Sequence, residues 1–474
     1  MREVEVGKRE IDRFAEVLDE KRFAALQETA QRGRELLGDR SIWSVNSTAR
    51  GGGVAEMLVP MLAYCRGAGV NARWAVMEGD PDFFAVTKRL HHRLHGMAGD
   101  GGPLGDDERA IYERAQEANA ESLLELVDPG DVVLVHDPQP AGLVPRLVEH
   151  GCVVVWRLHI GSDLDNDLVH EAWDFLVPYV KQAHACVFSR DEYVWPDLDS
   201  DRTHVIAPSI DAFSPKNQDI DPDACRAILS AAGLIGSDGG SEPRYRRNDD
   251  SEALVKTRAR MEEDAPVPAD APLILQVSRW DPLKDPIGVI QGFATRADAL
   301  EGVHLMLAGP DVSAVSDDPE GQQVFDEVRA RREQLDEGLR ARIHLASLSM
   351  EDVDENAATV NALQRHAAIV VQKSLAEGFG LTVAEALWKA RPMVASGVGG
   401  IQDQIDDGKT GLLLDDPRDP EAFGDALLEL VNDYDGAQEL GDRGREAVRD
   451  QFLESRHLID WVELLAGLEV SRSD

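Results

Sequence analysis

Short apolar runs, rich in β-branched residues, alternate with helical patterns along most of the 474-residue chain. Strands that are apolar on both faces and are joined by helices are typical of a parallel sheet with helices on each side. The alternation therefore predicts an α/β fold. In the first half of the chain the apolar runs lie at 41–45, 131–136, 152–158 and 185–189.

The alternation weakens between about 209 and 271, where the polar run SDGGSEPRYRRNDDSE is rich in turn formers. It then resumes, which predicts two doubly wound, Rossmann-like domains that face each other across a cleft. We expect the first domain at 1–210, joined by a C-terminal helix within 453–474. The second is expected at 211–452, with an acidic insertion near 214–270. The second series of apolar runs lies at 273–278, 303–308, 343–345, 368–372 and 393–395.

The charge of the chain limits its partners. It has 49 basic and 88 acidic residues, a formal net charge of −39. This disfavours nucleic acid or an anionic membrane as the main partner, because binding phosphate groups needs a basic face. Only 10 of the basic residues are Lys, and acidic excess with scarce Lys is typical of proteins from salt-accumulating halophiles; an ordinary acidic protein remains the alternative.

The location of the protein is also constrained. No stretch approaches 18 consecutive apolar residues, the first residues lack a secretory apolar region, and the four cysteines form no CxxC pair. We therefore expect a cytoplasmic protein with reduced thiols. Asp-x-Asp triplets carry almost no information in so acidic a chain, so no metal site is predicted.

Two cations follow the first apolar run of the second series. Arg279 and Lys284 lie on the loop after that strand, in the run SRWDPLKDP. Ligands of doubly wound sheets bind beyond the carboxyl ends of the strands. There, an Arg fork and a Lys point charge can clamp a diphosphate. The alternative is that both are surface charges paired with Asp281 and Asp285.

A strand-turn-helix pattern follows in QKSLAEGFGLTVAEAL, from Gln372 onward. Gly380 permits a tight turn, and a helix is predicted from near Thr382. In one interpretation Thr382 and Glu385 form a capping box. In the other, the helix N-terminus faces an anion, Glu377 accepts hydrogen bonds from sugar hydroxyls and Glu385 reaches a ribose. The two interpretations of Glu385 are compatible.

The first half contains two weaker signals. Gly51, Gly52 and Gly53 form a glycine-rich turn, for which a phosphate cradle and a simple turn are equally plausible. Polar residues also end two neighbouring strands, in the runs HDPQP and WRLHIGSD. A buried His is more often a core residue than a ligand, but polar groups on two adjacent strand ends favour a binding site.

Together these stretches resemble the retaining glycosyltransferases of family 4, the glycogen-synthase-like family, whose fold is GT-B. Glu377 and Glu385 match its E-x7-E motif, and Arg279 with Lys284 matches its donor-phosphate pair. HDPQPAGL, VVWRLHI, SRWDPLKDPIGVI and QKSLAEGFGLTVAEALWKARPMVASGVGGI are similar to one branch, the trehalose glycosyltransferring synthases of archaea and bacteria. The resemblance covers about 41–452.

This resemblance implies reversible, retaining transfer of glucose from UDP-, ADP- or GDP-glucose to free glucose, giving α,α-trehalose. It implies no required cofactor, with Mg²⁺ as an optional assistant bound through the nucleotide, and a homodimer as one possible assembly. Trehalose phosphorylase, or a family 4 enzyme with another acceptor, is the alternative. A non-catalytic sugar or nucleotide sensor is disfavoured by the complete set of cations and carboxylates.

The resemblance also assigns residues to roles. The catalytic group is Arg279, Lys284 and Glu377. The donor-binding group is Gly52, Gly53, His159, Gly378, Phe379, Gly380, Leu381, Thr382 and Glu385. The acceptor-binding group is Asp137, Gln139, Arg157 and Asp163. Two departures from the family pattern stand out. Gly161 occupies a position where an Asp is expected, so that an acceptor contact is either lost or passed to Asp163, and the acidic segment at about 219–265 looks expanded.

Overall fold

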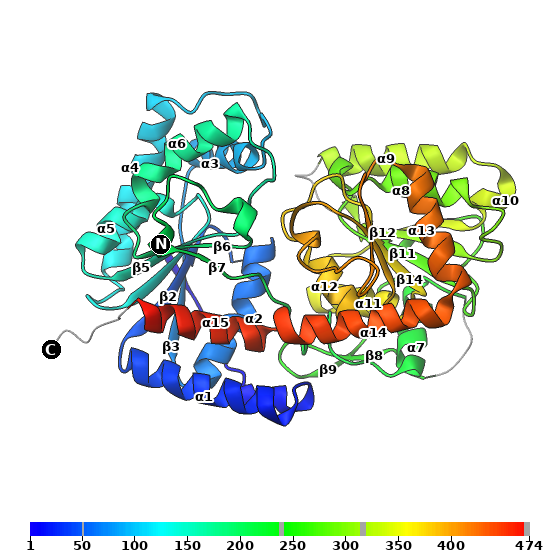
Figure 1. Cartoon of the computed structure of the whole chain (residues 1–474), viewed down its shortest axis with the longest axis horizontal. Coiled ribbons are helices and arrows are strands. Elements are labelled where there is room, and N and C mark those ends of the chain that lie inside the picture. Colours follow the sequence, from blue (N-terminus) through cyan, green and yellow to red (C-terminus); the bar gives the residue numbers. More distant parts are fainter. Residues whose placement is uncertain (50–51, 237–240, 313–318, 469–474) are drawn as a thin grey trace. The chain divides into compact units, whose positions relative to one another are not determined.

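The computed structural model describes residues 1–49, 52–236, 241–312 and 319–468 (Figure 1). Contacts between residues divide the chain into two compact units. The first unit comprises Met1–Ser209 and Gln451–Asp474, and the second comprises Ile210–Asp450. The chain thus passes from the first unit to the second after Ser209 and returns before Gln451.

The first unit is built on a seven-stranded sheet with the order β1-β3-β2-β4-β5-β6-β7. All neighbouring pairs are parallel except β1 with β3. Its strands are β1 (Arg2–Val4), β2 (Ser41–Asn46), β3 (Asn71–Val76), β4 (Val132–His136), β5 (Val153–Leu158), β6 (Ala185–Phe188) and β7 (Thr203–Val205). Its helices are η1 (Ile11–Glu16), α1 (Glu20–Leu37), α2 (Gly53–Gly67), α3 (Pro81–Leu94), α4 (Asp106–Leu124), η2 (Ala141–Leu143), α5 (Val144–Glu149), α6 (Asp167–Val180), η3 (Asp191–Tyr193), η4 (Ser200–Arg202) and α15 (Glu454–Gly467).

The second unit has a sheet of the same kind, with the order β10-β13-β12-β11-β14-β15-β16 and only β10 antiparallel to its neighbour. Its strands, including the separate hairpin β8–β9, are β8 (Arg244–Arg246), β9 (Glu252–Leu254), β10 (Arg260–Glu262), β11 (Leu273–Val277), β12 (His304–Pro310), β13 (Ile343–Leu348), β14 (Ile369–Gln372), β15 (Met393–Ser396) and β16 (Leu412–Leu414). Its helices are α7 (Pro222–Ala232), η5 (Pro282–Lys284), α8 (Pro286–Thr295), α9 (Pro319–Glu333), α10 (Glu337–Arg340), α11 (Val353–His366), α12 (Leu381–Trp388), η7 (Gly399–Ile401), α13 (Pro420–Asn432) and α14 (Tyr434–Gln451).

The α/β prediction is confirmed, because all nine apolar runs form buried strands of the two sheets. Each sheet packs against helices through an apolar core that includes Trp43 and Trp156 in the first unit and Phe293 and Phe325 in the second. The sequence patterns missed the hairpin β8–β9 and, in the two large sheets, five strands: β1, β3, β7, β10 and β16. Four of these five are three-residue strands at or near a sheet edge, where tertiary pairing rather than periodicity defines the strand.

A C-terminal helix was predicted within 453–474, and α15 spans Glu454–Gly467. Trp461, Leu464 and Leu465 are buried. The helix, red in Figure 1, packs against α1 and α2. The chain therefore completes the first unit with residues that follow the whole of the second.

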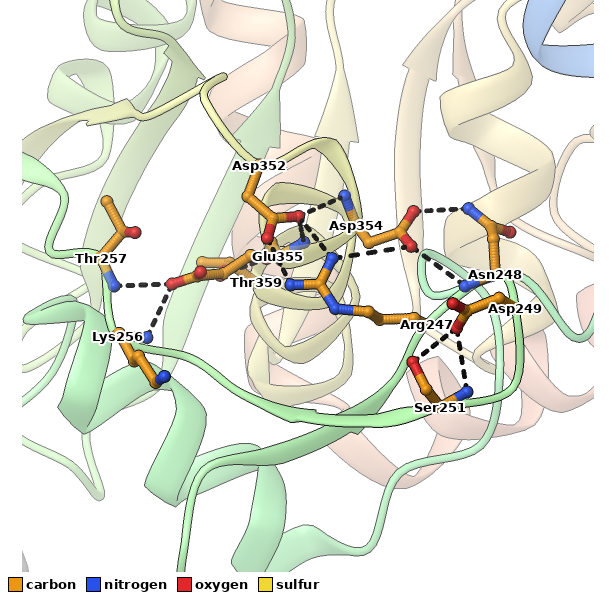
Figure 2. Close-up of polar contacts among 10 residues, drawn as sticks. All are labelled: Arg247, Asn248, Asp249, Ser251, Lys256, Thr257, Asp352, Asp354, Glu355 and Thr359. Carbon is orange, nitrogen blue, oxygen red and sulfur yellow. Dashed lines mark hydrogen bonds and ion pairs between the residues drawn. The ribbon is translucent and has the colours of Figure 1, made fainter.

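The segment predicted as an acidic insertion contains more structure than its turn-rich sequence indicates. α7 packs on α11, and β10 extends the sheet at its edge. The hairpin β8–β9 is fastened to the start of α11 (Figure 2). Arg247 pairs there with the carboxylate of Asp352, the residue that caps α11. Glu355 accepts hydrogen bonds from the backbone amides of residues 256 and 257, at 2.7 and 2.6 Å.

Candidate active site

The chain reverses its winding direction in the second sheet between β11 and β14, which are parallel neighbours. β12 and β13 follow β11 outward on one side, while β15 and β16 follow β14 on the other. The loops after β11 and β14 therefore leave the same edge at a switch point, where open α/β sheets bind ligands. These loops carry Lys284 and Glu377.

Lys284 and Glu377 form an ion pair at this edge. Lys284 Nζ lies 2.5 Å from Glu377 Oε2, and the two side chains are 14% and 13% exposed. Ser374 Oγ donates to the same carboxylate oxygen at 3.3 Å. An ammonium and a carboxylate thus meet in a partly buried place, where charge interactions are stronger than in open water.

Arg279 pairs with a different carboxylate, that of Asp281. Its side chain is 71% exposed and Nη2 lies 3.0 Å from Asp281 Oδ2. Asp281 also caps the short η5 helix by accepting the amide of Leu283. Of the two predicted cations, the structure brings Lys284 to Glu377, while Arg279 has the surface pairing with Asp281 that was the alternative interpretation.

The turn before α12 differs from the capping-box prediction. The cap residue is Gly380, in the left-handed region at φ 82°, and the helix begins at Leu381. Thr382 is therefore inside the first turn and is not the cap, so the predicted box with Glu385 is wrong. Glycine takes this backbone conformation at little cost, which allows the helix to start before the hydroxyl residue.

A second glycine-rich segment supports the turn at 377–380. A Cβ on Gly399 would lie 1.8 Å from the carbonyl oxygen of Glu377, and one on Gly400 would lie 2.7 Å from the ring of Phe379. The amide of Gly400 donates to Gly378 O at 2.9 Å. Sequence reasoning quoted this GVGGI run without a role, but its glycines are what permit the close packing.

The side chain of Gln404 also binds the backbone of this turn. Gln404 is buried and its Nε2 donates to the carbonyl of Phe379 at 2.6 Å. Phe379 is itself buried, whereas Gly378, Leu381 and Thr382 are half-buried. The predicted donor-binding residues 378–382 are thus one continuous turn whose shape is fixed by contacts with residues 399–404.

Glu385 lies one turn inside α12, and its side chain is 7% exposed. Its carboxylate is 3.4 Å from Lys216 Nζ. One turn further on, the buried Lys389 donates to the Glu385 carbonyl and to Asn217 Oδ1, at 2.9 and 3.0 Å. Burial holds the pKa of Lys389 well below its usual range. The residues at 216 and 217 and Lys389 were not among the predicted site residues.

In the first unit, Asp137 follows β4 in the left-handed region, at φ 67°. Its Oδ1 accepts the backbone amide of His159 at 2.8 Å. Its own amide and carbonyl bond to the Arg157 carbonyl and the Trp156 indole. Burial raises the pKa of Asp137 to about 6, against the opposing effects of the His159 amide and Arg157.

Two histidines stack beside this turn. His136 Nδ1 lies 2.9 Å from His159 Nε2, and Arg157 Nε is 3.3 Å from His159 Nδ1. Burial and the nearby Arg157 lower both histidine pKa values, so both rings are neutral. Because Arg only donates, His159 accepts at Nδ1 and donates from Nε2. Both of its ring nitrogens are therefore engaged, and a hydrogen bond from either nitrogen to a sugar requires one of these bonds to break.

Arg157 is fully buried and connects these strand ends to α15. Its Nη2 donates to Ile206 O at 2.8 Å, and its guanidinium lies 5.6 Å from the Trp461 ring centre. The Trp461 indole in turn donates to His457, whose other nitrogen lies 3.0 Å from Ser209 Oγ. Burial lowers the pKa of Arg157 to about 9. Arg157 thus lies inside the unit, in a polar network with the returning helix.

The remaining predicted acceptor residues are nearer the surface. Asp163 Oδ1 lies 2.6 Å from Nη1 of the buried Arg190. Gln139 is half-buried, and its carbonyl accepts from Gln116 at 2.6 Å. Gly161, the departure from the family pattern, packs against the ring of Tyr193, where a Cβ would lie 2.3 Å from the ring.

The glycine-rich turn begins α2. Gly52 caps the helix at φ 86° and Gly53 is its first residue. A Cβ on either glycine would meet no atom within 4 Å, so packing does not require glycine there. Gly51 lies outside the described residues.

Sequence reasoning missed two groups that hold the predicted ones in place, Gln276 and Lys373. It named Asp285 only as a surface partner of the two cations, whereas Asp285 pairs with Lys373. A Lys directly after the apolar run AIVVQ was a signal, because buried lysines need a partner. That partner, Asp285, is 88 residues away in sequence, so no local pattern could identify it. Among the described residues, no cluster of His, Cys, Asp or Glu is placed to hold a metal ion, and no helix is long and apolar enough to cross a membrane.

Comparison with known proteins agrees with the observed α/β fold of two sheets. Residues 44–195 match the family "Trehalose synthase, N-terminal domain", and residues 257–447 match "Glycosyl transferases group 1". An α,α-trehalose-phosphate synthase (UDP-forming) from Burkholderia vietnamiensis is structurally similar, with a TM-score of 0.63 at 17% identity. The match covers 90% of this chain and 98% of that one. Two Rossmann-like sheets of this kind, together with the match to the glycosyl transferase family, identify a glycosyltransferase with the GT-B fold.

Proteins of similar sequence show to which family of glycosyltransferases the chain belongs. A trehalose synthase from Rubrobacter xylanophilus is 36% identical over 471 residues, covering 99% of both chains. A trehalose phosphorylase from Pleurotus pulmonarius is 26% identical over 445 residues, covering 88% of this chain and 56% of that protein. The chain belongs to the trehalose synthase family, and it is a glycosyltransferase of the trehalose synthase type whose reaction is trehalose-related glycosyl transfer.

Proposed function

We propose that this enzyme transfers glucose from a nucleoside diphosphate glucose to free glucose, reversibly, and forms α,α-trehalose with the donor's anomeric configuration retained. The observation that carries the proposal is the ion pair between Lys284 and Glu377 at the switch point of the second sheet, with Glu385 on the helix that follows. These residue types match what binding of a sugar diphosphate needs: a cation for phosphate and carboxylates for hydroxyls.

The donor would bind the second unit. Lys284 would exchange its contact with Glu377 for the diphosphate, and Glu377 would then accept hydroxyls of the donor glucose. Arg279, which is exposed, would add its charge to the leaving group. Amides of residues 378–380 and the start of α12, at Leu381 and Thr382, would face the donor. Glu385 would hold the ribose diol.

The acceptor glucose would bind the first unit beside Asp137, with Gln139, Arg157 and Asp163 shaping its pocket. His159 would contact the donor sugar, and Gly52 and Gly53 would lie over the phosphates. The fully buried Arg157 would act through His159 rather than by touching sugar.

Retention follows from front-side attack. The bond between the anomeric carbon and the phosphate oxygen breaks while the acceptor hydroxyl attacks from the same face. The departing phosphate oxygen accepts the hydroxyl proton, so no carboxylate nucleophile is needed. The protein supplies positioning and charge stabilisation of the leaving group, which are large effects in a partly buried site. Mg²⁺ bound through the nucleotide would assist the leaving group, although the proposal does not require it.

A product assay tests the reaction. The enzyme is incubated in concentrated KCl with UDP-, ADP- or GDP-glucose and either glucose or glucose 6-phosphate, and products are identified by NMR. We expect an α,α-1,1 disaccharide from glucose, and its breakdown when trehalose and the nucleoside diphosphate are supplied. Glucose 1-phosphate formed from trehalose and inorganic phosphate, with no nucleotide dependence, would instead establish a trehalose phosphorylase.

Two variants test which residues act on the donor and which bind the acceptor glucose. Lys284→Ala should reduce kcat by at least about 100-fold, because its charge stabilises the leaving group, while circular dichroism shows an intact fold. Asp137→Ala should raise the KM for glucose and leave the affinity for the nucleoside diphosphate unchanged. Near-normal kcat in the first variant, or a selective loss of nucleotide affinity in the second, would contradict the assignment.

A further inference from the structure

Beside the Lys284–Glu377 pair lies a second ion pair, in which Lys373 is buried and Asp285 is 19% exposed. Lys373, directly after β14, is 1% exposed, and its Nζ donates to Asp285 Oδ2 and, at 2.6 Å, to the carbonyl of Pro417. Asp285 is the neighbour of Lys284 in sequence. The two loops of the proposed donor site are therefore joined twice, by an outer pair and by an inner one.

Asp285 is held in a conformation that few residues adopt. It lies in the left-handed region, at φ 46° and ψ 49°, and caps α8 through a 3.1 Å bond from the amide of Gly288 to its Oδ1. A Cβ on Gly288 would lie 1.9 Å from Asp285 Oδ2. The glycine thus makes room for the carboxylate that Lys373 binds. A non-glycine residue in this region is strained and persists only where its surroundings fix it.

Backbone contacts transmit this position to Lys284. Gln276, buried at the end of β11, accepts the amide of Lys373 at 3.2 Å and donates to the carbonyl of Lys284 at 2.9 Å. The amide of Leu375 donates to Leu283 O at 2.8 Å. The carbonyl before Asp285 and the amide of Lys373 are thus bridged by one side chain.

A buried ion pair is weak evidence for stability, because removing two charges from water costs about as much as their attraction returns. A glycine at 285 would adopt the same backbone conformation without strain. The particular effect of the pair is to fix the loop at 281–285 relative to the loop at 373–377. Both catalytic side chains project from these loops.

We infer that Asp285 and Lys373 are positioning residues that set the place of the Lys284 ammonium relative to Glu377, and hence to the donor diphosphate. The inference rests on the role proposed above for Lys284. Neither residue touches the substrate; each acts through the backbone on either side of the outer pair.

A double-mutant cycle tests this inference, and nucleotide affinity is the quantity measured for each variant. Asp285→Asn with Lys373→Met removes both charges together, so no buried charge is left unpaired, and Asn tolerates the left-handed backbone. This double variant is made in the wild-type and in the Lys284→Ala backgrounds. Affinity for UDP, ADP and GDP is measured by calorimetry, alongside kcat and the thermal midpoint.

With Lys284 present, the double variant should weaken binding of the preferred nucleotide by about 10-fold and lower kcat by about 10- to 100-fold, since small displacements of a catalytic group have effects of this size. In the Lys284→Ala background it should change nucleotide affinity no further. Gly288→Ala, which displaces the carboxylate and keeps both charges, should reproduce the loss.

Arg332→Met is the matched control. Arg332 is a similarly buried cation of the same unit, paired with Asp264 and bonded to Ile343 O at the opposite end of the strands. Its loss should lower the thermal midpoint and leave kcat unchanged.

Each alternative outcome overturns a different statement. Equal loss of affinity in both backgrounds, or none in the first, would show that the inner pair is only structural. Wild-type protein that binds none of the three nucleotides would refute the proposed function, and the positioning role with it. Nucleotide binding without trehalose formation would refute only the assigned reaction.

Discussion

At the scale of single residues, Gly161 is explained by a neighbour distant in sequence. A Cβ at this position would lie 2.3 Å from the Tyr193 ring. Gly161→Ala should therefore destabilise the protein by about 1–3 kcal/mol, the usual range for overpacking. Adding Tyr193→Ala should recover part of that loss. Urea unfolding of the two single variants and the double variant gives the coupling; strictly additive losses would contradict the steric explanation.

The raised pKa of a single residue, Asp137, predicts that the stability of the protein depends on pH. Burial raises its pKa from 3.8 to about 6. In wild type, stability from this group is complete below about 3.8 and is lost as the pH rises through about 6, because the unfolded carboxyl ionises first. Asn at 137 does not titrate and can still accept the His159 amide. The Asp137→Asn variant should therefore gain stability relative to wild type as the pH rises from 5 to 7.

Asp264 is the control for this prediction, because its pKa is shifted in the opposite direction. Arg332 and Arg340 beside Asp264 lower the pKa of that carboxyl, so its contribution is present at neutral pH and lost as the pH falls. Asp264→Asn should be less stable than wild type at neutral pH, with a deficit that shrinks on acidification. Unfolding curves in urea at fixed KCl measure both differences. A difference for Asp137→Asn that does not vary with pH would contradict the raised pKa.

At the scale of elements, one carboxylate links the hairpin β8–β9 to a helix (Figure 2). Asp352 caps α11 through the amides of residues 354 and 355 and also pairs with Arg247. Asp419 caps α13 in the same way, through the amides of residues 421 and 422. Replacing either Asp by Ala should cost about 1 kcal/mol as a lost cap.

Only Asp352→Ala should also loosen the hairpin, because only that change removes the carboxylate that accepts two hydrogen bonds from Arg247 and leaves this side chain with Asp354 at 4.0 Å. Hydrogen exchange of the amides in 244–254 should accelerate in this variant and remain unchanged in Asp419→Ala. Local opening of this kind is what exchange measures. Equal protection in the two variants would show that the hairpin is held without Asp352.

There is a physical reason why the sequence predicted some of the strands and helices and missed others. Strands such as β4 and β14 are buried on both faces, so their apolar runs identify them without other information. β10 and β16 are three-residue edge strands defined by their partners. The start of α12 was predicted to within one residue, but the cap is left-handed Gly380 and not Thr382, because a preference for side-chain caps does not include backbone strain.

At the scale of the whole molecule, the net charge of −39 predicts a dependence on salt. Carboxylates repel one another in dilute buffer, and salt on the order of 1 M shortens the screening length to about 3 Å. We expect folding and activity to require KCl at molar concentrations, with a thermal midpoint that rises as KCl is added. Sucrose at equal water activity is the control, because it favours compact states without screening charge. Full stability in dilute buffer would contradict this prediction.

The sequence by itself determined the α/β class and the positions of nine buried strands along the chain. It also placed Lys284 and Glu377 after strands and Glu385 in the helix that follows, because periodicity and the rules of parallel sheets are local or follow chain order. Only the tertiary structure decided which of these residues meet. It paired Lys284 with Glu377 and Lys373 with Asp285, left Arg279 exposed beside Asp281, and buried Arg157 against a helix from the end of the chain. Contacts between residues 88 or more apart depend on how strands are ordered across a sheet, and that order is a property of the whole fold.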